Sequence, residues 1–314
     1  MTDPQWFKDL YYQLVKVRMT EEAIASEYSR QEMRCPVHLS IGQESVAVGV
    51  CANLNSDDVI FSTHRCHSHY LAKGGDLNEM IAELYGKENG CAGGYGGSMH
   101  LVDERVGIMG SSAIVGGSIP LAAGAALSFK QSHNSRIAVA FFGDGASEEG
   151  VFHETLNFAA LHRLPLIFVC ENNYLATASH MSARRCRDNL HQHGEIYGIP
   201  GKMVEGHNLL QIYCVTLQAV ESARRGEGPT LIEARTYRAM NHVGPKPNSV
   251  VFSQQEKLWG SGYETCPVEW FEEKCIKEGG CTMDDLNKIR IQIQREIESA
   301  FKEAKRSLFP EMAL

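Results

Sequence analysis

One acidic side chain stands between two glycines in the segment FFGDGASEEG, residues 141–150. A glycine pair around Asp144, directly after an apolar run, indicates a sharp turn that a bound group can approach closely. Further along, the apolar run LPLIFVC ends in ENN, residues 171–173. The Asp144 carboxylate, the Asn173 amide oxygen and a nearby backbone carbonyl form a set of hard oxygen ligands, which suits Mg²⁺ or Ca²⁺ and not zinc. Because Mg²⁺ usually keeps part of its shell for phosphates, the pattern predicts a site for a metal-bound diphosphate.

Backbone amides give a second reason to expect an anion at this turn. Gly145 and Ala146 follow Asp144 at the expected start of a helix, where N–H groups and the helix dipole favour negative charge. The turn carries no G-x-G-x-x-G fingerprint, and the chain has no G-K-[ST] phosphate loop. The alternative is an ordinary strand-to-helix turn in which Asp144 only caps the helix. Asn173 at the end of the next strand favours the metal site.

The surrounding pattern predicts a sheet that brings these two segments together. RIAVAFF and LPLIFVC are continuous apolar runs, as expected for strands of a parallel sheet with helices on both faces. Strands and helices alternate as helix 119–130, strand 136–142, helix 149–163, strand 165–171 and, later, strand 230–236. We therefore expect an α/β fold with a doubly wound, mostly parallel sheet, in which ligands collect outside the carboxyl ends of the strands.

Helical segments flank this core at both ends of the chain. Residues 4–31 show apolar positions at helical spacing after Asp3 and Pro4, which serve as cap and first-turn residue. Other expected elements are helices at 42–53 and 77–85, a short strand before a histidine-rich loop at 64–69, and a glycine-rich loop at 86–101. Residues 267–314 have a charged, helical pattern and are expected to form a helix packed on the α/β domain, residues 1–266.

Composition excludes several classes of protein. The chain has 314 residues with 43% hydrophobic and 22% charged residues, and its formal net charge of −8 argues against nucleic acid as a partner. Residues 1–14 lack the features of a secretory leader, so the ten cysteines are expected to be reduced and the protein cytoplasmic. The low-polarity stretch 107–129 contains repeated glycines and Pro120, so we expect a soluble helix capped by Ser118 and no membrane span.

The longest motif resembles a known cofactor signature. GDGASEEGVFHETLNFAALHRLPLIFVCENN is similar to the thiamine diphosphate motif. The chain resembles the alpha subunits of the first component of 2-oxo acid dehydrogenase complexes, in the pyruvate and acetoin dehydrogenase group. The likeness covers most of the chain, including LYYQLVKVRMTEEAIASEY, HLSIGQE, GGSMH, IVGGSIPLAAGAA and ARTYR. The motif is specific to the cofactor and not to the substrate.

The resemblance implies roles for particular residues. Mg²⁺ would be bound by Asp144, Asn173 and the carbonyl of Leu175. The diphosphate would be bound by Gly145, Ala146, Arg65 and Arg238. The cofactor would also contact His64 and His242, and Ile114 and Val115 would contact its aminopyrimidine ring. His38 and His242 would act on the substrate. The residue types agree with these roles, because guanidinium groups bind anions through planar forks and imidazoles can donate protons to a developing alkoxide.

Other interpretations of these residues remain open at the level of sequence. His38, followed by apolar Leu39, could be a buried core or turn histidine, and Arg238 could form a surface ion pair. The run HRCHSH, residues 64–69, could bind a metal, although alternating side chains on a loop rarely converge without a distant ligand. Many pyruvate enzymes have tyrosine where this chain has His64.

The resemblance also implies partners and a reaction. In two-chain members a beta subunit supplies the glutamate that activates the cofactor, so we expect an obligate beta partner, a small-molecule 2-oxo acid or acetoin substrate, and a lipoyl-bearing acyltransferase as acceptor. Thiamine diphosphate supplies a carbanion and an electron sink for decarboxylation or carbon–carbon cleavage. Two alternatives stay open: a split transketolase-like or acyloin-forming carboligase half-enzyme, and a non-catalytic binding subunit.

Overall fold

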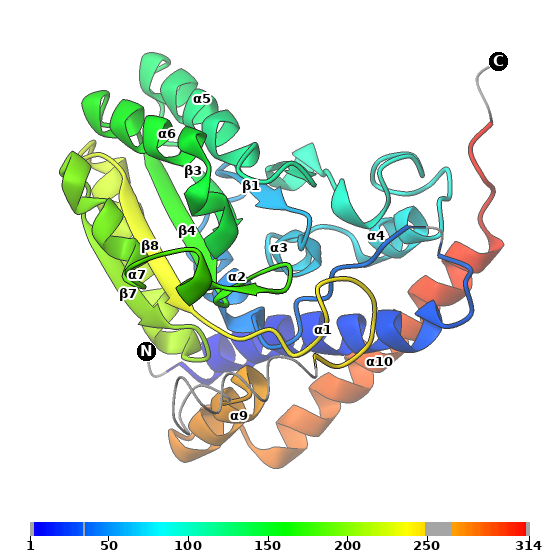
Figure 1. Cartoon of the computed structure of the whole chain (residues 1–314). Helices are drawn as coiled ribbons and strands as arrows, with labels where there is room; N and C mark the ends of the chain where they lie inside the picture. Colours follow the sequence, from blue (N-terminus) through cyan, green and yellow to red (C-terminus); the bar gives the residue numbers. More distant parts are fainter. Residues whose placement is uncertain (1–2, 34, 249–264, 312–314) are drawn as a thin grey trace.

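A parallel sheet forms the centre of the molecule (Figure 1). The computed structural model describes residues 3–33, 35–248 and 265–311. Within this part of the chain, six strands pair in parallel in the order β2-β1-β3-β4-β8-β7. The strands are β1 (Val59–Thr63), β2 (Ile108–Ser112), β3 (Ala138–Gly143), β4 (Leu166–Asn172), β7 (Gly201–Glu205) and β8 (Thr230–Arg235). A separate antiparallel pair is formed by β5 (Leu175–Ala176) and β6 (Ser179–His180).

Side chains of successive residues in the central strands point alternately into two hydrophobic cores, one on each face of the sheet. Val139 and Phe141 of β3 belong to one buried cluster, whereas Ala140 and Phe142 belong to the other. Every residue of β4 is buried. This two-sided burial explains why these strands have continuous apolar sequences rather than alternating ones. The predicted doubly wound α/β fold is confirmed.

Helices cover both faces of the sheet. One face packs against α5 (Ser118–Gln131) and α6 (Gly150–Leu161). The other face is covered by α2 (Glu44–Cys51), α3 (His67–Ala72) and α7 (Leu209–Arg224), and α1 (Pro4–Tyr28) and α4 (Leu77–Leu84) belong to the same buried cluster. The C-terminal helices α9 (Pro267–Lys277) and α10 (Met283–Arg306) lie against α1 (Figure 1). Asp3 caps α1 by accepting a hydrogen bond from the Gln5 amide at 2.9 Å, as predicted.

Two predicted boundaries around α5 and α6 were wrong. Ser118 is the first residue of α5 and makes no capping hydrogen bond, because the cap position falls on Gly117. The turn at Asp144 leads into a short 3₁₀ helix, Asp144–Glu148, and α6 starts only at Gly150. Gly145 and Ala146 therefore lie in this 3₁₀ segment and not in the first turn of α6.

Two other predicted elements also differ from the structure. The histidine-rich loop at 64–69 turns helical at His67, where α3 begins, because the His67 and His69 side chains are buried and hydrogen-bonded. The C-terminal segment is not one helix. It breaks at Gly279, which has a φ of +72°, and at Gly280, where an added Cβ would lie 2.5 Å from the ring of Phe7.

Three further expectations concern the chain as a whole. None of the described helices combines the length and apolarity needed to cross a membrane. No disulfide links the cysteines in the described ranges. The division into residues 1–266 and 267–314 stays a prediction, and its boundary adjoins residues 249–264, which lie outside the described part, as do residues 312–314.

Candidate active site

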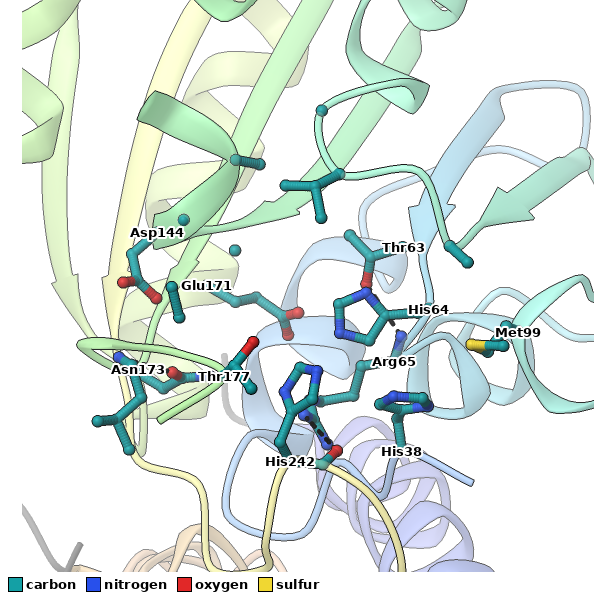
Figure 2. A pocket seen from close by; sticks show the side chains of 18 of the residues that line it. His38, Thr63, His64, Arg65, Met99, Asp144, Glu171, Asn173, Thr177 and His242 are labelled. Carbon is teal, nitrogen blue, oxygen red and sulfur yellow. Dashed lines mark hydrogen bonds between the residues drawn. The ribbon is translucent and has the colours of Figure 1, made fainter. Parts of the chain in front are cut away.

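The carboxyl ends of four strands, β1 to β4, meet at one cavity (Figure 2). The strand order reverses between β1 and β3, which is where an open α/β sheet forms a crevice for ligands. The cavity has a volume of about 220 Å³. All the site residues predicted from the sequence line it: His38, His64, Arg65, Ile114, Val115, Asp144, Gly145, Ala146, Asn173, Leu175, Arg238 and His242. The sequence thus predicted which residues would meet, and their individual roles remain proposals.

Oxygen ligands occupy one end of the cavity. The side chain of Asp144 is 1% exposed, and Asn173 lies opposite it in Figure 2. The Asn173 side chain is held in place because its Nδ2 donates to Gln43 Oε1 at 2.8 Å and its Oδ1 accepts from the Leu175 amide at 3.1 Å. An added Cβ on Gly145 would lie 2.9 Å from Ala176 Cβ, so the two loops approach too closely for a larger residue. This donor set fits a hard divalent cation such as Mg²⁺.

An arginine that sequence reasoning missed contacts the same carboxylate. Arg184 Nη2 donates to Asp144 Oδ2 at 2.5 Å, and the same guanidinium also pairs with Glu148. Burial raises the pKa of Asp144 even though Arg184 acts in the opposite direction. A guanidinium therefore stands beside the carboxylate that was predicted to bind a metal cation. Nothing in the spacing of the sequence could have placed Arg184 there.

Two buried guanidinium groups lie on the cavity wall without a carboxylate partner among the described residues. Arg65 is 5% exposed and donates to the carbonyls of Leu39 at 2.5 Å and His242 at 3.3 Å. Arg238 is 3% exposed and donates to the carbonyls of Met240 and Thr177, both at 3.0 Å. Burial lowers the pKa of both groups, to about 10 for Arg65.

This pair of guanidinium groups fits a bound diphosphate. Buried charges without a counter-charge are costly, and a diphosphate would supply that counter-charge through charge-assisted hydrogen bonds. The possibility that Arg238 forms a surface ion pair is wrong, because its side chain is buried and bonds to two carbonyls and the His242 ring rather than to a carboxylate.

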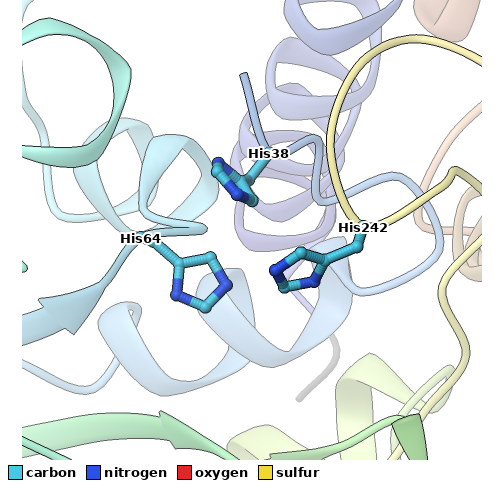
Figure 3. A group of neighbouring side chains, drawn as sticks. All are labelled: His38, His64 and His242. Atoms are coloured by element: carbon cyan, nitrogen blue, oxygen red, sulfur yellow. The ribbon is translucent and has the colours of Figure 1, made fainter. Parts of the chain in front are cut away.

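Three histidines gather at the other end of the cavity (Figure 3). The ring centroids are 4.7 Å apart for His38 and His64, 5.1 Å for His38 and His242, and 5.2 Å for His64 and His242. Burial, with the positive charge of Arg65 and its neighbours, lowers the pKa of His38 and His64 to about 3 and that of His242 to about 4. These imidazoles are therefore neutral at physiological pH and can donate an N–H without carrying charge.

The run HRCHSH, residues 64–69, does not form a metal cluster of its own. His67 bonds to Glu21 and Ser98, at 3.0 and 2.8 Å. His69 instead bonds to Ser62 at 2.7 Å and stacks on Phe141. Of the three histidines in the run, only His64 joins the cavity, because α3 directs the other two into the protein interior.

Buried carboxylates organise the loops around the histidines. Glu21 of α1 accepts hydrogen bonds from the amide and hydroxyl of Ser40, two residues after His38, and from His67. Glu83 of α4 accepts four backbone N–H groups from the glycine-rich loop at 2.7 to 2.9 Å: those of Ala92, Gly94, Gly96 and Gly97. Sequence reasoning missed both glutamates, since each sits within an otherwise ordinary amphipathic helix.

Glu171 is a further residue that sequence reasoning passed over. It precedes the Asn172–Asn173 pair at the end of β4, is 3% exposed, and lines the cavity between Asp144 and His64 (Figure 2). Its Oε2 lies 3.4 Å from His69 Nε2, and its Oε1 has no hydrogen-bond partner among the described residues. The signal available in the sequence was an acidic residue at the carboxyl end of a buried strand.

Fold and site together define an α/β protein that binds a phosphorylated cofactor with a divalent metal at the carboxyl edge of a parallel sheet. Comparison with known proteins agrees, because residues 12–313 match the model of the family described as dehydrogenase E1 component. The chain belongs to this family. Enzymes of the family depend on thiamine diphosphate, normally with Mg²⁺ or a similar divalent metal, and the chain is accordingly an oxidoreductase of the E1 dehydrogenase class.

Individual relatives are similar over nearly the whole chain. The alpha subunit of acetoin:2,6-dichlorophenolindophenol oxidoreductase from Bacillus subtilis is 36% identical over 301 residues, covering 96% of this chain and 89% of the relative. The pyruvate dehydrogenase E1 component subunit alpha of Porphyra purpurea is 35% identical over 311 residues, covering 97% and 90%. The human somatic mitochondrial pyruvate dehydrogenase E1 subunit alpha is 32% identical over 291 residues, covering 92% and 73%.

Proposed function

We propose that this chain is the alpha subunit of a two-subunit, thiamine diphosphate-dependent dehydrogenase that acts on a pyruvate-like 2-oxo acid or on acetoin. The observation that carries the proposal is the cavity itself, which is lined by oxygen ligands, two buried guanidinium groups and three neutral imidazoles. The relatives named above are alpha subunits of acetoin and pyruvate enzymes, which supports this choice of substrates.

Each end of the cavity has a distinct task in this proposal. Asp144, Asn173 and the Leu175 carbonyl would hold Mg²⁺, and Arg65 with Arg238 would hold the diphosphate. When bound, thiamine diphosphate supplies a nucleophilic carbon and an electron sink. The residues of this chain would bind the cofactor with its metal ion and orient it.

The histidines would act on the substrate. His38 and His242 would each hold an N–H against a substrate oxygen on which negative charge develops, and His64 stands beside both. Because these imidazoles are neutral, they stabilise that oxygen by hydrogen bonding rather than by giving up a proton from an imidazolium.

A beta subunit would complete the site. Ile114 and Val115 line the cavity yet are 74% and 51% exposed, and Leu121 of α5 nearby is 60% exposed. Apolar side chains grouped at the mouth of a buried cavity favour a covering protein surface. We propose that the partner covers this mouth and supplies the activating glutamate, and that the acyl group passes to a lipoyl-bearing acyltransferase.

The test uses the chain co-purified with a beta-type subunit. Reduction of an artificial electron acceptor would be followed with Mg²⁺ and thiamine diphosphate, across pyruvate, 2-oxobutanoate, branched 2-oxo acids and acetoin. The proposal predicts turnover of at least one of these substrates, and loss of that turnover when the beta subunit is omitted. Cofactor binding without acceptor reduction on any substrate would overturn it in favour of a carboligase or transketolase-like half-enzyme, for which aldehyde acceptors are the next panel.

A further inference from the structure

The three histidines come from distant parts of the chain and point toward one another (Figure 3). His38 precedes α2, His64 follows β1 and His242 follows β8. One ring nitrogen from each lies within 4.8 Å of those of the other two. Three imidazole ligands around an open position form the arrangement of a catalytic-type zinc site, whereas Mg²⁺ requires oxygen ligands. The cluster is therefore chemically distinct from the oxygen ligands around Asp144.

Ring nitrogens of the cluster are available for binding. Within the described ranges, His38 Nδ1 is buried without a hydrogen-bond partner, and the His64 ring makes no hydrogen bond. His242 Nδ1 lies 3.4 Å from Arg238 Nη1, which leaves its Nε2 for another partner. Zn–N bonds of about 2.0–2.1 Å place ligand nitrogens about 3.4 Å apart, so small side-chain rotations would close the cluster around a metal ion.

Charged side chains around the cluster set how tightly it can bind a metal ion. Arg65 and Arg238 line the same cavity as Asp144 and Glu171, but Asp144 is already paired with Arg184, so Glu171 is the buried carboxylate left to face the two guanidinium groups. Glu171 also keeps Oε1 without a partner among the described residues. A divalent cation would thus enter a cavity whose buried guanidinium groups oppose it, which makes the site weaker than a structural zinc site.

We propose that His38, His64 and His242 bind a borderline transition metal such as Zn²⁺. The site is separate from the Mg²⁺ site proposed at Asp144. A metal ion here would occupy the nitrogens that the proposed function assigns to the substrate, so zinc would act as a reversible inhibitor. Metal binding itself does not depend on the proposed reaction; only the inhibition does.

Cobalt is the probe, because four-coordinate Co²⁺ has visible absorption bands that Mg²⁺ does not produce. The two-subunit protein, freed of transition metals and kept in saturating Mg²⁺, would be titrated with Co²⁺. We expect one strongly absorbing Co²⁺ per alpha chain, displaced by Zn²⁺. Absence of these bands would overturn the proposal, and would do so without bearing on thiamine diphosphate binding or turnover.

Variants locate the metal. His64→Gln should weaken Co²⁺ binding by at least about tenfold, since loss of even an outer-shell partner costs that much. The control, His133→Gln, alters an exposed histidine in the turn that follows α5 and should bind Co²⁺ like the wild type. Equal binding by His64→Gln would contradict the proposal. X-ray absorption of the zinc-loaded wild type needs no variant, and should show three imidazole ligands; fewer than three would overturn the assignment.

Discussion

Replacing Arg184 with glutamine should tighten Mg²⁺ binding. Arg184 Nη2 donates to Asp144 Oδ2 at 2.5 Å, and the two side chains are only 13% and 1% exposed. A metal ion that binds Asp144 must compete with this guanidinium for the carboxylate. Arg184→Gln removes the competing charge while it keeps a polar side chain of moderate length.

The size of the effect follows from the contact that is lost. A hydrogen bond to a charged group contributes about 1.5–3 kcal/mol, equivalent to roughly 10- to 150-fold in an equilibrium constant. Arg184 also pairs with Glu148, so a displaced guanidinium keeps a partner and its displacement costs less than the full amount. We therefore expect Mg²⁺ to bind about tenfold more tightly to Arg184→Gln.

Isothermal titration of Mg²⁺ into the two-subunit protein, with thiamine diphosphate present, measures this affinity. Arg185→Gln is the matched control, because Arg185 bonds to Ser147 and Glu148 but not to Asp144. Its Mg²⁺ affinity should stay within about twofold of the wild type, which corresponds to about 0.4 kcal/mol in binding free energy. Unchanged or weaker Mg²⁺ binding by Arg184→Gln would refute the competition and show that Arg184 supports the metal site.

Three further results are expected. Gly145→Ala should weaken thiamine diphosphate binding by about 1–3 kcal/mol, because its Cβ would lie 2.9 Å from Ala176 Cβ; Gly124→Ala, at an exposed position of α5 away from the cavity and with nothing within 4 Å, should bind normally in the same titration. His38→Gln should reduce the decrease in the free energy of unfolding that occurs as the pH falls. The folded-state pKa of about 3 lies below the unfolded value of 6.5, so this group costs the wild type about 2 kcal/mol of folding stability between pH 6.5 and pH 5. His64 and His242 have lowered pKa values too and act in both proteins, so urea unfolding at both pH values should show a loss that is smaller by about that amount in the variant, and equal losses would contradict the prediction. Glu83→Gln should lower the free energy of unfolding by about 2–3 kcal/mol and speed hydrogen exchange of the backbone amides in the glycine-rich loop, because a side-chain amide has one acceptor oxygen for the four N–H donors. Unchanged exchange in this loop would contradict the role of Glu83.

The sequence predicted the core of the fold because local pattern and tertiary environment agree there. The run LPLIFVC is apolar throughout, and β4 is buried on both faces, so strand type and sheet class followed from the same residues. Asp144 and Asn173 could be placed together because adjacent parallel strands end at the same edge. Arg65, Arg238 and His38 came from the family resemblance alone, since nothing in their local pattern separates them from ordinary residues.

The parts that sequence reasoning missed depend on contacts between distant segments. His67 begins α3 because Glu21 and Ser98, far away in the chain, satisfy its ring nitrogens. The break before α10 depends on Phe7, which packs where a side chain at residue 280 would lie. Arg184 reaches Asp144 from a loop whose sequence has no periodic pattern. Such contacts leave no trace in spacing or composition.

Thiamine diphosphate binding with and without Mg²⁺ tests the central claim most directly. The two-subunit protein would be titrated with thiamine diphosphate in Mg²⁺, then in EDTA, and the Mg²⁺ titration repeated with Asp144→Asn. The account predicts tight binding by the wild type in Mg²⁺ and large losses both in EDTA and in Asp144→Asn, because the metal joins the carboxylate to the diphosphate. Equal binding in Mg²⁺ and EDTA, or by Asp144→Asn and the wild type, would contradict a metal-bound diphosphate at this edge of the sheet.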